Sequence, residues 1–151
     1  MLELQLDIYA PTHNPAGAPG AGRGVTTNGI TKANGAAVMG AGVAKTVRDL
    51  YPGIDQKLGQ LLREKGNHVH LLMSAPVNIF SFPTKHHWRD NSDPALIARS
   101  ASELVALVDA QAWDIVYLPR PGCNNGKLNW NTVAALLKPL FDERFIICTK
   151  G

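Results

Sequence analysis

One stretch of small residues, 34–46, restricts the possible folds of this chain more than any other feature. It has no charged side chain before Lys45 and contains three glycines, whose missing Cβ atoms let backbone N–H groups come close to a ligand. From Val43 the apolar spacing becomes helical, with Val47 and Leu50 on the same face until a proline ends the run. A loop that leads into a helix N-terminus presents free N–H groups and the positive end of the helix dipole. The stretch therefore predicts either an anion-binding loop or a tight turn with close helix packing.

The length of 151 residues is enough for one domain with a substantial core, so we predict a single domain covering residues 1–151. A hydrophobic content of 45% and a charged content of 18% are typical of a soluble globular protein. No apolar run is long enough to cross a membrane, and the N-terminus lacks the features of a signal peptide. Two cysteines form neither a disulfide framework nor a zinc motif. We therefore expect a cytoplasmic protein with no membrane partner. Its net charge of +3 favours an anionic ligand.

Short β-type runs alternate with amphipathic helical segments along the chain. This alternation predicts an α/β sandwich, with helices on a mostly parallel sheet whose carboxyl edge collects the ligand-binding loops. Residues 10–24 are rich in glycine, proline and alanine and are predicted to form a surface loop. Strands are predicted at 2–6, 25–28, 69–73, 77–82, 115–118 and 145–148, and helices at 43–50, 54–65, 94–108 and 133–140.

A second glycine- and asparagine-rich segment, 121–130, follows the predicted strand at 115–118. By itself it indicates only a turn, but its place at the end of a strand makes it a partner for the first loop. Neither loop is accompanied by a carboxylate cluster of the kind that holds Mg²⁺, so the pair predicts binding of a preformed diphosphate with no metal and no cofactor. His68 and His70 share one side of a predicted strand, but no cysteine or carboxylate stands beside them in sequence.

Both loops resemble the ligand loops of the macrodomain family. The first, Asn34 with Val-Met-Gly-Ala-Gly-Val-Ala at 38–44, is similar to the family's Asn, small-residue run and Val-Met-Gly-x-Gly-Ile/Val-Ala. The second resembles the family's Gly-Cys-Gly-x-Gly-Gly-Leu-x-Trp, although Asn-Asn-Gly-Lys at 124–127 departs from the glycine-rich pattern. The resemblance covers nearly the whole chain. It implies a three-layer α/β/α sandwich with a mixed, mostly parallel sheet that binds ADP-ribose.

The resemblance also implies a set of binding residues. Asp7 and Ile8 would meet the adenine, the two loops would wrap the diphosphate, and Asn34 is favoured over Asn28 as the contact to the distal ribose. The residues expected to bind the substrate are Asp7, Ile8, Asn28, Asn34, Val38, Met39, Gly40, Ala41, Gly42, Val43, Pro83, Thr84, Gly122, Cys123, Asn124, Asn125, Gly126, Lys127 and Leu128.

Lys85 is the candidate catalytic residue. It follows an apolar strand containing Phe80 and Phe82, so its amine is expected to be partly desolvated, which favours the neutral form needed for nucleophilic or acid–base chemistry. Residues 82–89, Phe-Pro-Thr-Lys-His-His-Trp-Arg, resemble the Phe-Pro-Thr-Lys-x-His-Trp-Arg stretch of the DarG and terminal ADP-ribose glycohydrolase branch. This resemblance implies a glycohydrolase that removes ADP-ribose from modified nucleic acid, DNA included, or from protein. DarG is an antitoxin with a second domain that binds its toxin, and we expect no such toxin-binding domain within these 151 residues.

Three other functions fit some of the same residues. A reader would bind ADP-ribose without turnover and would not need Lys85. A phosphatase acting on ADP-ribose 1″-phosphate would use a side chain such as His86 or His87 beside the distal ribose. A Cys–His hydrolase would use Cys123 as its nucleophile, but a small packing residue is the simpler interpretation of this cysteine.

Overall fold

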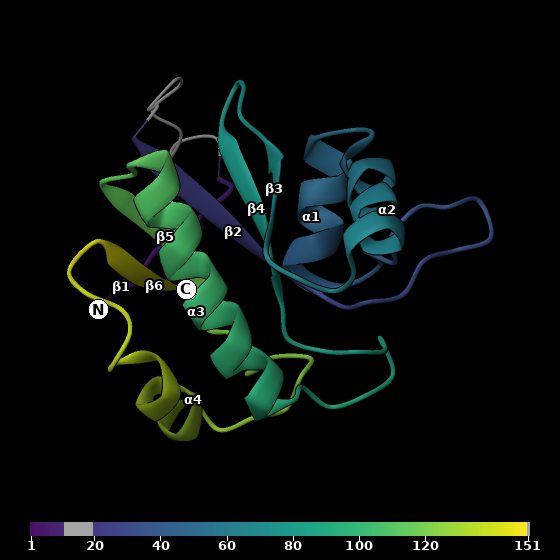
Figure 1. Ribbon diagram of the computed structural model, residues 1–151. Helices are drawn as coiled ribbons and strands as arrows, with labels where there is room; N and C mark the ends of the chain where they lie inside the picture. Colours follow the sequence, from purple (N-terminus) through teal and green to yellow (C-terminus); the bar gives the residue numbers. More distant parts are fainter. Residues whose placement is uncertain (11–19, 151) are drawn as a thin grey trace.

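The computed structural model describes residues 1–10 and 20–150, and part of the predicted loop at 10–24 therefore lies outside the described residues. Strands and helices follow one another along the chain as the sequence predicts (Figure 1). They are β1 (Leu2–Gln5), β2 (Ala21–Thr27), α1 (Gly42–Leu50), α2 (Ile54–Lys65), β3 (His70–Met73), β4 (Asn78–Pro83), α3 (Pro94–Gln111), β5 (Ile115–Pro119), α4 (Trp130–Leu137) and β6 (Phe145–Thr149).

The strands form one mixed sheet in the order β1-β6-β5-β2-β4-β3. Every neighbouring pair is parallel except β3 with β4, which is antiparallel. The five parallel strands therefore end at the same edge, and the loops that follow them lie close together there. The predicted mostly parallel sheet and the predicted place of the ligand loops at its carboxyl edge are both confirmed.

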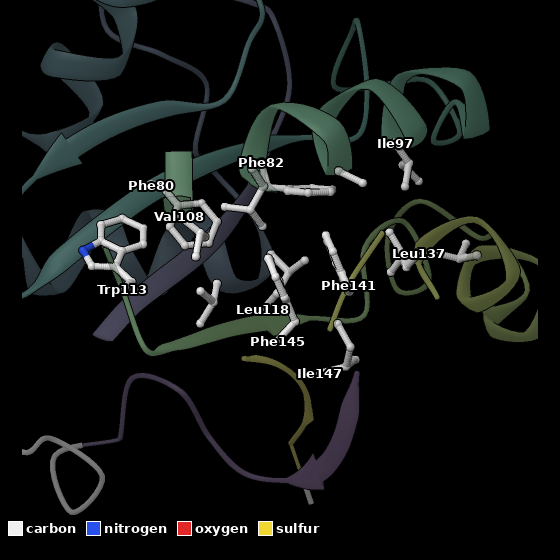
Figure 2. Packing of buried hydrophobic residues seen from close by; sticks show 14 residues of the cluster. Phe80, Phe82, Ile97, Val108, Trp113, Leu118, Leu137, Phe141, Phe145 and Ile147 are labelled. Atoms are coloured by element: carbon white, nitrogen blue, oxygen red, sulfur yellow. The ribbon is translucent and has the colours of Figure 1, made fainter. Parts of the chain in front are cut away.

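Two hydrophobic clusters cover the two faces of the sheet and make the fold a three-layer α/β/α sandwich. On one face, α3 and α4 pack against aromatic side chains of β4 and β6, as Figure 2 shows. On the other face, α1 and α2 pack against Val25 and Ile79. Strand β4 serves both clusters because its side chains alternate, with Phe80 and Phe82 facing α3 and Ile79 facing α1.

Strand β2 begins earlier than predicted, inside the segment that the glycine content assigned to a loop. Its glycines are needed by the packing of the sheet. A Cβ on Gly22 would overlap the Trp113 ring, and a Cβ on Gly24 would lie 2.6 Å from Leu118 and 2.9 Å from Phe80. Large side chains from neighbouring elements thus fill the space that side chains of β2 would need. Glycine in a strand marks such close approach, which no local sequence pattern reveals.

Smaller differences concern exposed leucines. Leu50 was predicted on the buried face of α1 but is 46% exposed, because it is the last residue of the helix. Leu140 is 41% exposed and lies beyond α4, which ends at Leu137, before the proline. By contrast, the predicted start of α3 is confirmed, since the Asp93 side chain accepts a hydrogen bond from the Ala95 N–H at 2.9 Å.

Candidate functional site

A cavity of about 510 Å³ opens at the carboxyl edge of the sheet, where the loops after β2, β4 and β5 meet. This volume is within the range of small-molecule sites. The lining residues come from all three loops and from the first turn of α1. They are Thr26, Thr27, Asn28, Val38, Gly40, Ala41, Gly42, Val43, Ala44, Thr84, Lys85, Trp88, Ser92, Pro119, Arg120, Gly122, Asn124, Asn125 and Gly126.

A second cavity of about 600 Å³ adjoins the first and extends toward β1 and β6. It is lined by the segment after β1, including Asp7 and Ile8, and by the end of β6. The two cavities share lining residues at the start of α1 and in the second loop, so together they form one elongated groove. The shared residues are Gly42, Val43, Pro119, Arg120 and Asn124.

Hydrogen bonds from the Asn28 side chain hold the first loop in place. The Asn28 amide donates to the carbonyl oxygen of Val38 at 3.1 Å, and its oxygen accepts from the Ile30 N–H at 3.0 Å. Further on, Gly42 has a φ of 58°, a left-handed conformation that favours glycine. This turn brings the backbone into the first helical turn of α1 directly at the groove. The loop thus presents backbone, not bulky side chains, to the cavity.

Asn34 does not reach the groove, and the prediction that favoured it is corrected. It lies at the tip of a turn that residues 31–37 form through an isolated bridge, with Thr31 opposite Ala37. Its side-chain oxygen accepts from the Ala36 N–H at 3.0 Å, so it shapes this turn. The residues between Asn28 and Asn34 lead the chain into this turn and away from the groove. Asn28 is the asparagine that lines the cavity.

The second loop is bent back on itself so that it forms a wall of the groove. Gly122 has a φ of 78°, and its carbonyl oxygen accepts from the Leu128 N–H at 2.8 Å. Lys127 also adopts a left-handed φ, of 62°. The two loops come together across the groove, since a Cβ on Gly42 would lie 3.1 Å from the Asn125 side-chain nitrogen.

Lys85 lies in the loop that follows β4, and its side chain connects this loop to the second loop. Its Nζ donates to the carbonyl oxygens of Asn125 at 3.3 Å and of Trp88 at 3.5 Å. Its own backbone carbonyl accepts from the Asn67 amide at 3.0 Å. The lysine is half-buried and lines the first cavity. The arrangement places one amine at the point where a ligand in the groove meets both loops.

The chain matches no protein-family model. It is 29% identical over 121 residues to a DNA ADP-ribosyl glycohydrolase of Mycobacterium tuberculosis, covering 76% of this chain and 34% of that protein. It is 27% identical over 111 residues to one of Thermus aquaticus, covering 69% of this chain and 31% of that protein. The chain therefore spans about a third of the length of these curated relatives.

Solved structures agree with the sequence comparison. The macrodomain of Mycobacterium tuberculosis DarG superposes with a TM-score of 0.73 at 24% identity, covering 89% of this chain and 91% of that one. The macrodomain of Thermus aquaticus DarG also gives 0.73, at 22% identity, with 99% and 97% covered. The chain has the macrodomain fold. Its likeness in sequence and fold is to the DarG branch, as predicted. A third structure, Thermosipho africanus DarTG in complex with ADP-ribose, gives a TM-score of 0.70 at 21% identity, covering 87% of this chain and 38% of that one.

Most residues predicted for the site line the groove. Besides Asn34, four line neither cavity: Met39 is buried in the core, the Pro83 carbonyl accepts from Ser100, and Lys127 and Leu128 close the second loop from behind. The lining residues that sequence reasoning did not assign are Thr26, Thr27, Ala44, Ser92, Pro119 and Arg120 in the first cavity and, in the second, Leu6, Tyr9, Thr46, Cys148, Thr149 and Lys150. Pro119 and Arg120 could have been found, because they lie at the carboxyl end of a parallel strand.

The side chains that the alternative functions would use lie partly outside the groove. His86 lines neither cavity, and its Nε2 lies 2.9 Å from an Asp93 oxygen; this hydrogen bond lowers the pKa of the Asp93 carboxyl. Cys123 lines the second cavity, where burial raises the pKa of its thiol and disfavours the nucleophilic thiolate.

Among the described residues no group of three or more His, Cys, Asp or Glu side chains is placed to hold a metal. Within residues 1–10 and 20–150, no helix has both the length and the apolar character needed to cross a membrane.

Proposed function

We propose that this macrodomain binds ADP-ribose along the groove. The adenine lies in the second cavity beside Asp7 and Ile8, the diphosphate lies between the two loops, and the distal ribose enters the first cavity near Asn28. The continuity of the two cavities supports this placement. The solved DarTG complex with ADP-ribose supports the choice of ligand. Backbone N–H groups at a helix N-terminus suit a diphosphate without requiring a metal.

Binding is expected at a Kd near micromolar or tighter, on the order of −8 kcal/mol, because the groove encloses both ends of the ligand. Calorimetric titration of the protein with ADP-ribose measures it directly, and ADP and free ribose serve as the partial ligands. If no heat and no competition appear at millimolar ADP-ribose, the assignment of the groove is wrong.

We further propose that the macrodomain is an ADP-ribosyl glycohydrolase, with Lys85 acting at C1″ of the distal ribose. One observation carries this proposal: Lys85 lines the first cavity, and its amine donates to the Asn125 carbonyl oxygen of the second loop. In the reaction the bond between C1″ and the macromolecule breaks, the leaving atom keeps the electron pair and takes a proton, and water adds to C1″. Such cleavage passes through an oxocarbenium-like state, which a lysine stabilises by attack at C1″ or by acting on the departing group.

The rim of the first cavity favours a nucleic acid as the modified macromolecule. Trp88 lines the cavity and is 45% exposed, although a large aromatic side chain is usually buried. The His87 ring stacks on it with centroids 5.3 Å apart, and the Arg89 guanidinium lies 4.7 Å from its centroid. An exposed aromatic ring beside an arginine is the arrangement that single-stranded nucleic acids bind, through base stacking and phosphate contacts. The names of the two curated relatives support DNA.

Trp88→Leu is expected to lower kcat/KM for ADP-ribosylated single-stranded DNA by roughly tenfold to a hundredfold, since one base–aromatic stack contributes about 1–3 kcal/mol. Release of ADP-ribose from an ADP-ribosylated peptide, measured in parallel, should change by less than about threefold, a difference below 1 kcal/mol. An equal loss on both substrates would mean that Trp88 shapes the ADP-ribose cavity and has no role in binding nucleic acid.

A further inference from the structure

The side chain of Asn67, in the turn after α2, is hydrogen-bonded to the main chain of Lys85. Its amide nitrogen donates to the Lys85 carbonyl oxygen at 3.0 Å. Asn67 lines neither cavity, so this contact lies away from the surface that a ligand would meet. The nitrogen of the amide must face the carbonyl, because the amide oxygen in the same place would bring two acceptors together. Asn67 therefore acts on the lysine and not on a ligand.

The carbonyl oxygens on either side of Lys85 are bound by main-chain donors. The Thr84 carbonyl oxygen accepts from the Asp93 N–H at 2.9 Å. The His86 carbonyl oxygen accepts from the Gly29 N–H at 3.2 Å. A main-chain donor remains when a side chain is replaced, except by proline. The hydrogen bond to the Lys85 carbonyl, which comes from a side chain, is therefore the one of these three that a simple substitution removes.

Asn67 also packs closely against the end of β2. A Cβ on Gly29 would lie 3.0 Å from the Asn67 amide nitrogen and 3.1 Å from the His86 carbonyl oxygen. Gly29 directly follows Asn28, which lines the first cavity. Because Gly29 has no side chain, the amide of Asn67 fits between the segments that follow β2 and β4.

Helix α3 holds the turn that carries Asn67. The Arg99 guanidinium donates to the Asn67 carbonyl oxygen. One carboxylate oxygen of Glu103 accepts from the Val69 N–H at 3.0 Å, and the other lies 2.7 Å from His68 Nδ1. Arg99 and Glu103 are four residues apart and therefore lie on one face of the helix, where they also form an ion pair of 3.6 Å. The position of the Asn67 amide is thus fixed by a long helix.

The oxygen of the same amide shows that Asn67 is poorly suited to a purely structural role. Its Oδ1 is buried and has no hydrogen-bond partner among the described residues. A buried unpaired oxygen disfavours the folded state, and native proteins contain few of them. A leucine of similar shape would avoid this cost, but it could not donate to the Lys85 carbonyl.

The Lys85 side chain itself is held less firmly than its backbone. The distances from Nζ to the carbonyl oxygens of Asn125 and Trp88, 3.3 and 3.5 Å, are long for N–H···O hydrogen bonds. The place of the amine therefore depends mainly on where the main chain of Lys85 lies. We propose that Asn67 is a positioning residue for the glycohydrolase reaction, which acts by fixing the Lys85 carbonyl. This inference rests on the proposed function.

The test uses Asn67→Leu, which removes the donor with little change of shape. Single-turnover release of ADP-ribose from modified DNA is expected to slow by roughly tenfold to a hundredfold, because a small displacement of a reacting group has effects of this size. The Kd of ADP-ribose should change by less than about twofold, a small free-energy difference. The Tm should stay within about 3 °C of the parent, since a hydrogen bond and an unpaired oxygen are lost together. Asn67→Asp, which also lacks the donor, should show the same slower release.

Asn78→Leu is the matched control. The Asn78 amide donates to the Ala21 carbonyl oxygen at the same distance, 3.0 Å, but at the opposite end of β4. Its replacement should lower Tm and leave the rate of release within about twofold of the parent. In spectra of protein labelled with ¹³C at lysine Cε, the signal that Lys85→Ala lacks should move in Asn67→Leu and stay in place in Asn78→Leu.

The outcomes separate this inference from the proposed function. If the parent releases ADP-ribose and both Asn67 variants release it at the parent rate, the inference is wrong while the function stands. Slower release that is accompanied by an equal rise in the Kd of ADP-ribose also overturns it, because Asn67 would then support the groove as a whole. A parent that releases no ADP-ribose overturns both.

Discussion

Replacing Lys85 by alanine is expected to lower the rate of ADP-ribose release from modified DNA by roughly 10²–10⁴-fold, the usual contribution of a positioned acid–base or nucleophilic group. The Kd of ADP-ribose should change by less than about threefold. Binding survives because the Lys85 amine is hydrogen-bonded to backbone carbonyls at the edge of the cavity, while the loops themselves supply the surfaces that enclose the ligand. Single-turnover release assays with calorimetry on the same variant separate the two quantities.

Two further variants make this result specific. Lys127→Ala removes another lysine of the second loop, one that lines neither cavity, and should turn over like the parent. Lys85→Arg keeps a positive charge that cannot be lost near neutral pH, so it should be inactive if a neutral amine is needed and partly active if charge alone suffices. Lys85 is a rim residue, and the mechanism is wrong, if the alanine variant turns over at the parent rate.

Introducing a glutamate at Gly40 is expected to weaken ADP-ribose binding by a factor of about 100 or more, because a carboxylate would stand where the diphosphate is proposed to lie. Gly40 lines the first cavity, and a Cβ added there meets no atom within 4 Å. The side chain therefore enters open space without a clash. Gly42→Glu would also obstruct the groove, but the φ of 58° at Gly42 adds backbone strain to the effect.

Gly40→Ala is the control for the glutamate variant. It carries the same backbone change without charge or length, and it should bind ADP-ribose within about threefold of the parent. Circular dichroism and Tm should be the same for parent, alanine and glutamate forms, since neither side chain contacts the core. If the glutamate variant binds as tightly as the parent, the diphosphate does not pass this loop.

The most predictable residues of the site were those whose place follows from their immediate neighbours in sequence. The Lys85 segment follows an apolar strand, and Gly42 opens a helix with helical apolar spacing; both features can be read within a dozen residues. Both residues line the first cavity. The local sequence could not show which of Asn28 and Asn34 lines the cavity. Asn34 has the motif spacing but forms the tip of a turn, and only the path of residues 31–37 shows that Asn28 lines the cavity.

The sequence by itself determined the fold class, the order of most strands and helices, and the meeting of the ligand loops at one edge. These follow from hydrophobic periodicity, which is a local property, and from the rule that parallel strands end on the same side. The tertiary structure alone decided that β2 includes Gly22 and Gly24, because the side chains that fill their space come from β4, β5 and the turn after α3. It alone decided that the side-chain oxygens of Thr27 and Ser92 are buried without a hydrogen-bond partner among the described residues. Whether a hydroxyl finds a partner depends on residues distant in the chain, and no local pattern carries that information.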